Sequence, residues 1–219
     1  EKPLPEITSE EYPFEIPDTW QWCRLGQVIR LLNGNSFRSG DFQKGAGVKC
    51  IKITNAGVGE FVETDDTLPL GFDTSYSKYR VLSGDLILAL TRPYVSTGLK
   101  ISRCPDSYDG ALLNQRVAAI RPIRGMNTDY MFLFLSSDFV LRGYQDEFES
   151  KGQQPNLKSA HVTHLRLPLP PHAEQVAIVE RAAVLMKNCS KLDAEIERSL
   201  SQAGHLIQAV LREAFTGST

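Results

Sequence analysis

This 219-residue sequence has few cysteines and no long hydrophobic run. The first absence argues against a disulfide or zinc framework, and the second argues against a membrane-spanning protein. No two cysteines form a Cys-x-x-Cys pair, and they are widely spaced, at Cys23, Cys50, Cys104 and Cys189. This usage is atypical of a disulfide framework or a zinc site and typical of reduced, buried thiols in a cytoplasmic protein. The longest apolar runs, Leu86–Leu90 and Met131–Leu135, have only five residues. A membrane span needs about 20 residues, so we expect no membrane partner.

Motifs of the common enzyme classes are also missing. The sequence has no Gly-x-Ser-x-Gly motif, no phosphate-binding loop and no Gly-x-Gly-x-x-Gly motif. It has no Asn/Asp-Pro-Pro-aromatic tetrapeptide, so adenine methylation is not predicted. His161 and His164 are three residues apart, and we interpret them as structural or surface histidines rather than metal ligands. We therefore expect a non-catalytic chain with no catalytic residues, no metal and no cofactor of its own.

The net charge of −2 is distributed unevenly along the chain. Residues 1–22 hold six acidic and one basic side chains, and residues 173–219 hold six acidic and five basic ones. Residues 23–172 therefore carry 18 bases against 14 acids. A mildly basic central region is compatible with a nucleic-acid partner but is not specific evidence for one.

Composition and periodicity divide the chain into three parts. Residues 1–22 contain four prolines and predict an extended, acidic lead-in on the surface. Residues 23–172 predict a globular α+β domain rather than a doubly wound sheet, because strands are followed by helices and then by a further strand. Residues 173–219 predict a long helix. Within the central part we expect strands at Val48–Thr54, Leu86–Leu90, Thr97–Arg103, Gln115–Arg121 and Leu165–Leu169. We expect helices at Tyr130–Leu135, with Thr128 as N-cap, and at Asp138–Phe148.

The last 45 residues contain one continuous helical pattern. No proline follows Pro171, and from Ile178 onward apolar residues recur with steps of 4, 3, 4, 3, 4, 4, 3, 4, 3 and 4. This heptad stripe, with one extra step between Ile196 and Leu200, predicts a long helix that packs lengthwise on another helix. Over Ala173–Glu213 such a helix would be roughly 60 Å long. We call the stripe the apolar seam; it comprises Ile178, Ala182, Leu185, Cys189, Leu192, Ile196, Leu200, Ala203, Ile207, Val210 and Ala214.

Four clusters of polar residues in predicted loops are candidates for DNA contacts. Arg, Lys, Asn and Gln can form paired hydrogen bonds with base edges, and Ser, Thr and Lys commonly hold phosphates. Solvated loops are polar in any case, so no single loop is specific evidence. The clusters are Asn33, Asn35, Ser36 and Arg38; Lys52, Thr54 and Asn55; Thr91, Arg92, Tyr94, Ser96 and Thr97; and Lys151, Gln153, Gln154 and Asn156.

The junction before the long helix has a distinctive order of residues. A short predicted strand is followed by Pro168, Pro170 and Pro171, then by Glu174 and Gln175, and then by the apolar stripe from Ile178. This order resembles that of the specificity (S) subunits of type I restriction-modification systems, in which a short strand is followed by Pro-x-Pro-Pro, Glu-Gln and a long apolar-periodic helix. Four other stretches agree in the same order: residues 13–28 (PFEIPDTWQWCRLGQV), 83–88 (SGDLIL), 152–157 (GQQPNL) and 206–217 (LIQAVLREAFTG). The matches therefore run from residue 13 to residue 217.

The resemblance implies a target recognition domain followed by one conserved spacer helix. In the family, two such helices pack antiparallel and hold two recognition domains apart, and each domain recognises one half of a bipartite sequence in double-stranded DNA. The helices also dock methyltransferase (M) subunits, which bind S-adenosylmethionine and flip the target adenine. A translocase-nuclease (R) subunit completes the complex. Because family members have two domains and two helices, this chain resembles a half-subunit. We expect it to pair with a second half-subunit, and a second copy of the same chain could fill that role.

Two further expectations follow. The chain begins with Glu1 rather than Met, which indicates a fragment or a trimmed chain. A natural half-subunit, the C-terminal half of a longer chain and a proteolytic piece all fit the sequence; residues 1–8 (EKPLPEIT) resemble the linker between the two halves, which slightly favours the C-terminal half. The alternative function is a protein-interaction module without DNA binding, in which a globular head sits on a coiled-coil dimerisation stalk. Salt-dependent DNA binding by the central domain distinguishes the two.

Overall fold

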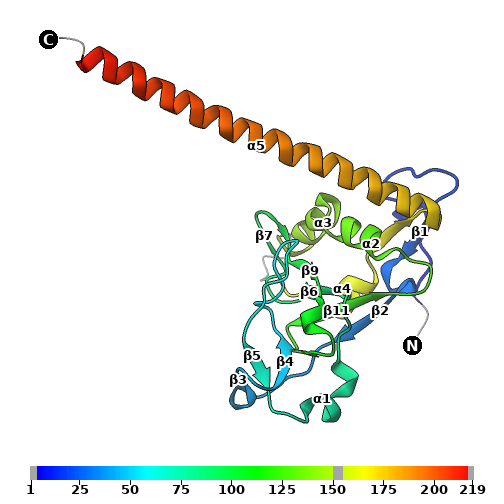
Figure 1. Cartoon of the computed structure of the whole chain (residues 1–219). Coiled ribbons are helices and arrows are strands. Elements are labelled where there is room, and N and C mark those ends of the chain that lie inside the picture. Colours follow the sequence, from blue (N-terminus) through cyan, green and yellow to red (C-terminus); the bar gives the residue numbers. More distant parts are fainter. Residues whose placement is uncertain (1–3, 150–154, 217–219) are drawn as a thin grey trace. The chain divides into compact units, whose positions relative to one another are not determined.

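The computed structural model describes residues 4–149 and 155–216. The chain divides into two compact units, Glu1–Gln175 and Val176–Thr219 (Figure 1). The strands are β1 Gln21–Arg24, β2 Ile29–Asn33, β3 Gln43–Lys44, β4 Val48–Ile51, β5 Asp66–Leu68, β6 Leu86–Ala89, β7 Tyr94–Val95, β8 Gly98–Leu99, β9 Ile101–Arg103, β10 Leu112–Leu113, β11 Val117–Pro122 and β12 Arg166–Leu169. The helices are α1 Phe72–Ser75, α2 Thr128–Leu135, α3 Asp138–Glu149, α4 Ser159–Thr163 and α5 His172–Thr216. The predicted α+β class with a long C-terminal helix is confirmed.

A four-stranded antiparallel sheet in the order β2-β11-β6-β9 forms the centre of the globular unit. All four residues of β6 are buried, as expected for an interior strand with no polar side chain. Arg121 of β11 reaches back to the nearly inaccessible carboxylate of Asp85, with two hydrogen bonds of 2.7 Å. This paired contact fixes the turn before β6 against the neighbouring strand.

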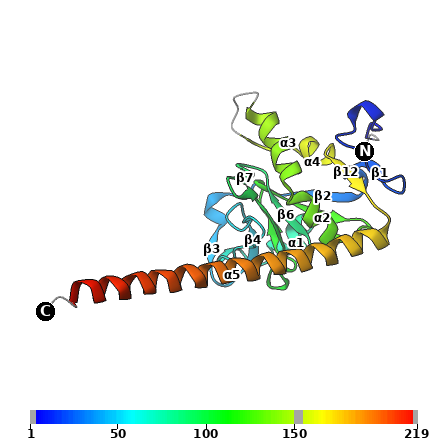
Figure 2. The same ribbon diagram turned by 90° about the horizontal axis from the view of Figure 1, so that it is seen from above.

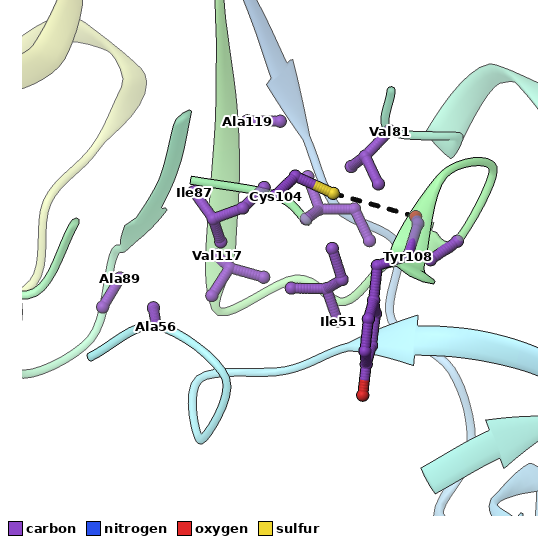
Figure 3. Packing of buried hydrophobic residues seen from close by; sticks show 11 residues of the cluster. Ile51, Ala56, Val81, Ile87, Ala89, Cys104, Tyr108, Val117 and Ala119 are labelled. Atoms are coloured by element: carbon purple, nitrogen blue, oxygen red, sulfur yellow. Dashed lines mark hydrogen bonds between the residues drawn. The ribbon is translucent and has the colours of Figure 1, made fainter. Parts of the chain in front are cut away.

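A second sheet, in the order β10-β4-β5-β3, packs beside the first and carries a parallel β10–β4 pair. Figure 1 shows β3, β4, β5 and α1 grouped at one end of the globular unit. Buried side chains from both sheets meet in one cluster, including Ile51, Ile87, Tyr108 and Val117 (Figure 3). Tyr108 is fully buried, and its hydroxyl donates to the Thr64 carbonyl oxygen at 2.7 Å. The two sheets therefore share one core.

Three of the four cysteines lie within the globular unit, where Cys50 and Cys104 are buried, as predicted, and Cys23 is only partly buried. Burial raises the pKa of the Cys50 and Cys104 thiols to about 12 and that of Cys23 to about 11. The prediction of burial is wrong for Cys189, which is exposed on α5. It belongs to the apolar seam, where only a partner helix would cover it.

The N-terminal segment is tied to the end of the globular unit by β1, which pairs antiparallel with β12. The Arg24 guanidinium contacts the Glu11 carboxylate at 2.7 Å and also donates to the His164 carbonyl oxygen at 3.2 Å. The hydrogen bond from Arg24 lowers the pKa of Glu11 below its usual value. The first and the last strand of the globular unit therefore pair with each other in one small sheet.

The first turn of α5 is anchored to the globular unit by two adjacent side chains. Glu174 accepts a hydrogen bond from the Trp20 indole at 2.7 Å. Gln175 is 2% exposed; its amide oxygen accepts from the Asn127 backbone at 2.9 Å, and its amide nitrogen donates to the Pro170 carbonyl oxygen at 2.9 Å. The Glu-Gln pair after the prolines thus has a structural role in this chain.

From Val176 onward α5 continues as one unbroken helix (Figure 2). Every residue of the apolar seam lies within it, and Leu192, Ile196 and Leu200 are each more than half exposed. Apolar side chains exposed in this regular spacing are typical of a helix that lacks its partner. No helix of the described chain combines the length and hydrophobicity that a bilayer span requires.

Several predicted elements differ from the structure at their ends. The strand predicted at Val48–Thr54 ends at Ile51, because residues 53–55 form a turn. The N-cap of α2 is Asn127, whose side chain accepts from the Tyr130 backbone at 2.9 Å, and Thr128 is already helical. The strand predicted at Gln115–Arg121 begins only at Val117, because residues 115 and 116 form a turn. Asn is as good a capping residue as Thr, so local preference did not distinguish the two.

The predicted strand Thr97–Arg103 is wrong as a single element. Leu99 pairs with Tyr94 in the β7–β8 hairpin, whereas Ile101 pairs with Leu88 in the central sheet. The chain changes partners at Lys100, whose amide donates to the Pro93 carbonyl oxygen at 2.7 Å. The short helix α4, which contains His161, was also not predicted.

Candidate nucleic-acid interface

The first predicted cluster lies against the turn that follows β10. The Asn35 amide donates to the Leu113 carbonyl oxygen at 2.8 Å, and the Gln115 amide donates to the Asn35 carbonyl oxygen at 3.0 Å. These backbone bonds hold residues 33–38 beside residues 113–115. Asn33, Ser36 and Arg38 are exposed there.

The second cluster shares a pocket with the same turn. Lys52 and Thr54, beyond the end of β4, line a cavity of about 470 Å³ together with Gln115 and Arg116. The Lys52 ammonium lies 2.5 Å from the Asp66 carboxylate, which also pairs with Lys44 at 2.8 Å. These two lysines hold the pKa of Asp66 below its usual value. The charge of Lys52 is therefore partly neutralised, which weakens its attraction for a phosphate.

The third cluster pairs with Asn156, the one member of the fourth cluster that the structure describes. Thr91 forms an antiparallel bridge with Asn156, and the Arg92 amide donates to the Pro155 carbonyl oxygen at 3.1 Å. Tyr94, Ser96 and Thr97 belong to the β7–β8 hairpin that follows, and Ser96 and Thr97 are exposed at its turn.

Two hydrogen bonds connect the loops that carry these clusters into one continuous surface. The Leu90 amide donates to the Arg116 carbonyl oxygen at 2.9 Å, which places the third cluster beside the turn at residues 115–116. The Ser159 hydroxyl donates to the Asn33 side-chain oxygen at 3.2 Å, which places the first cluster beside the segment after Asn156. The structure therefore brings together loops that are far apart in the sequence.

Arg92 has an unusual backbone within this surface. Its φ of 48° lies in the left-handed region, which residues with a side chain rarely adopt. Such a conformation costs about 1–3 kcal/mol and clusters at functional sites. Here it turns the chain between β6 and β7 and leaves the Arg92 side chain exposed.

Two exposed residues of the surface, Gln115 and Arg116, were missed because the sequence around them predicts a strand. The signal that could have found them is their position directly after a buried Asn and before an apolar run, which is typical of a turn. Arg38, Arg92 and Arg116 form no ion pair with any residue that the structure describes. Three uncompensated guanidinium groups therefore lie on one surface.

Other predicted residues are placed differently. Asn55 is fully buried; its side-chain oxygen accepts from the Lys52 amide at 2.7 Å, and its nitrogen donates to the Val62 carbonyl oxygen at 2.7 Å. Its hydrogen-bonding groups are thus used inside the fold. Lys151, Gln153 and Gln154 lie outside the described residues.

His161 lies within α4 and His164 directly follows it. His161 is 3.6 Å from the Glu147 carboxylate and packs edge-on against Phe148. Within residues 4–149 and 155–216, no three His, Cys, Asp or Glu side chains are grouped as metal ligands would be.

Comparison with known sequences gives a consistent result. Residues 17–202 match the family model for the type I restriction modification DNA specificity domain. The chain is 31% identical over 212 residues to the type I restriction enzyme EcoAI specificity subunit of Escherichia coli, which covers 96% of this chain and 36% of that protein. It is 32% identical over 169 residues to the MjaVIII specificity subunit of Methanocaldococcus jannaschii, with 76% and 39% covered. The chain thus spans little more than a third of the length of these relatives.

Solved structures share the fold. The HsdS subunit of Thermoanaerobacter tengcongensis superposes with a TM-score of 0.62 at 18% identity, over 94% of this chain and 47% of that one. A chain from a study of complex assembly and conformational transition of the type I R-M system gives 0.68 at 19% identity, over 94% and 49%.

Proposed function

The chain belongs to the type I restriction-modification DNA specificity family, and on that basis we propose that its globular unit recognises one half of a bipartite DNA target. The proposal is supported by the surface that the 115–116 turn forms with the exposed, described residues of the polar clusters, which are Asn33, Ser36, Arg38, Arg92, Ser96, Thr97 and Asn156. This surface combines amide side chains that suit base edges with guanidinium groups that suit phosphates. The chain itself performs no catalysis in this proposal.

Binding to duplex DNA tests the proposal. Because released counterions drive phosphate contacts, the affinity of the full chain for a pool of random-sequence duplexes should fall as salt rises. Arg116→Ala should weaken binding about tenfold and reduce the slope of log affinity against log salt by about one. Fluorescence anisotropy at several salt concentrations measures both quantities.

Arg124→Ala is the matched control, since Arg124 is also an exposed arginine but lies beyond the other end of β11. It should leave the affinity within about twofold of the unsubstituted chain. Salt-independent binding, or equal losses for both variants, would contradict the proposed surface.

We also propose that the apolar seam of α5 pairs antiparallel with the seam of a second half-subunit, and that a second copy of this chain can supply it. The steps along the seam are the same read from either end, with Ile196 at the centre. In an antiparallel pair about that centre, Ile178 faces Ala214, Leu185 faces Ile207 and Leu192 faces Leu200. Every seam residue then meets another seam residue.

Charges beside the seam oppose this pairing only slightly. Asp193 and Glu197 flank its centre, so two copies would bring like charges together. Exposed charge pairs contribute about 0.2–1 kcal/mol each, whereas burying one Leu or Ile side chain contributes about 1.5–3 kcal/mol. The apolar layers therefore outweigh the repulsion.

The end of α5 supports a further protein partner. Leu206, Leu211 and Phe215 are 66%, 50% and 82% exposed and lie beside the seam rather than on it. One partner helix would leave part of this wider apolar face uncovered. We assign it to docking of methyltransferase subunits, which would bind S-adenosylmethionine and carry the chemistry, with a restriction subunit completing the complex.

Phe215→Asp should reduce co-purification with a methyltransferase subunit about tenfold, because a carboxylate would replace a ring buried at the contact. His205→Ala, on the face of the helix opposite the apolar seam, is the control and should have little effect. Unchanged recovery with the Phe215 variant would argue against docking at this face.

A further inference from the structure

The pocket beside the 115–116 turn is bounded by side chains of opposite character. Phe37, Phe42 and Ile53 supply apolar walls, and Lys52, Asn114 and Arg116 supply polar groups. Phe37 is buried, and the Lys52 ammonium lies 5.0 Å from the centroid of the Phe42 ring. A pocket with apolar walls and a few fixed polar groups is typical of a site for a small planar ligand.

Asn114 is a largely buried polar side chain whose carboxamide is open to this pocket. It is 8% exposed, and its carboxamide forms no hydrogen bond with any described residue. The carboxamide therefore lines the pocket with unused donor and acceptor capacity.

The backbone holds Asn114 in this position. Its amide donates to the Ile51 carbonyl oxygen at 2.9 Å, and its carbonyl oxygen accepts from Val117 at 3.2 Å. Gly34 packs directly over it, where a Cβ atom would lie 1.9 Å from the Asn114 oxygen. Since the backbone is clamped on three sides, Asn114 cannot move outward to meet a ligand, and the ligand must enter.

The chemistry of the pocket selects among ligands. A carboxamide can form paired hydrogen bonds with a nucleobase edge, most favourably adenine. Aromatic and apolar walls suit the faces of an unstacked base, and cations at the rim suit its phosphate. A phosphate alone would leave the apolar walls and the amide unused. A base inside an intact duplex could not reach a side chain that is nine-tenths buried.

We propose that this pocket accepts one nucleobase unstacked from bound DNA, an inference that rests on the proposed DNA-binding function. Taking a base out of a duplex costs free energy, and the cost is smaller when the base is already unpaired. A duplex with one bulged adenine should therefore bind more tightly than the fully paired duplex of the same sequence.

The test compares these two duplexes with the full-length chain and three variants. The unsubstituted chain should prefer the bulged duplex about tenfold. Asn114→Leu and the less disruptive Asn114→Ser should both lose this preference while keeping affinity for the paired duplex within about threefold. Arg124→Ala, which alters an exposed arginine outside the pocket and the proposed surface, should keep the preference. Thermal unfolding identifies any variant that fails to fold.

The outcomes separate this inference from the proposed function. No preference for the bulged duplex, or a preference that survives in folded Asn114→Ser, would overturn the base pocket while DNA binding stands. Failure of the unsubstituted chain to bind either duplex would overturn the proposed function itself.

Discussion

Substitution of Leu192 by glutamate is expected to leave the chain monomeric at tens of micromolar, where the unsubstituted chain is expected to pair. In a symmetric pair Leu192 faces Leu200 in two layers, so one substitution places two carboxylates in apolar contacts. Burying an unpaired charge costs several kcal/mol per site. A loss of about 4 kcal/mol or more raises the dissociation constant roughly a thousandfold. Sedimentation equilibrium measures the change.

Val184→Glu provides the control for this experiment, because Val184 is 51% exposed on the same helix but lies away from the seam. It should leave the dimer constant nearly unchanged. A monomeric unsubstituted chain, or a dimer that survives Leu192→Glu, would show that the seam does not mediate self-pairing.

Gly34→Ala is expected to destabilise the globular unit by about 3 kcal/mol or more. The added Cβ would lie 1.9 Å from the Asn114 carbonyl oxygen and 2.7 Å from the Leu113 carbonyl oxygen. Both oxygens already accept backbone hydrogen bonds, so neither can move away without breaking the contact between residues 33–38 and the turn at residues 115–116. For a unit of this size, the midpoint of thermal unfolding should fall by roughly 10 °C.

Gly40→Ala tests whether the effect comes from the close contact rather than from the loss of a glycine. A Cβ atom at position 40 would meet nothing within 4 Å. Its melting temperature should stay within about 3 °C of the unsubstituted chain. Calorimetry of the two variants side by side measures both midpoints. If the two midpoints fell equally, the close contact at Gly34 would not be the cause of the destabilisation.

The long helix and the family were predictable from sequence because each depends on extended, regular signals. Helix α5 spans His172–Thr216, close to the predicted 173–219, since its stripe of apolar residues repeats over many turns without a proline. The resemblance that begins at residue 13 agrees with the family match over residues 17–202. The buried strand β6 was equally clear from its uninterrupted apolar run.

The candidate interface was predictable only in part because it depends on long-range pairing. Residue type suggested Thr91 and Asn156 separately, but no local pattern indicates that they form a bridge. Residue type also suggested Asn55, whose amide is used inside the fold, and gave no reason to select Asn114. Only the structure shows which of two asparagines lacks a partner.

The extra step between Ile196 and Leu200 has a consequence for the distance between the two DNA half-sites that a proposed pair of chains would contact. Sliding two paired α5 helices by seven residues would change the distance between their two Gln175 anchors by roughly 10 Å. That change equals about three base pairs of duplex at 3.4 Å each. However, the slide would set Leu192 against Asp193 or Leu200 against Ser199. In the proposed pair, the irregular step would therefore favour one spacing over those shifted by seven residues.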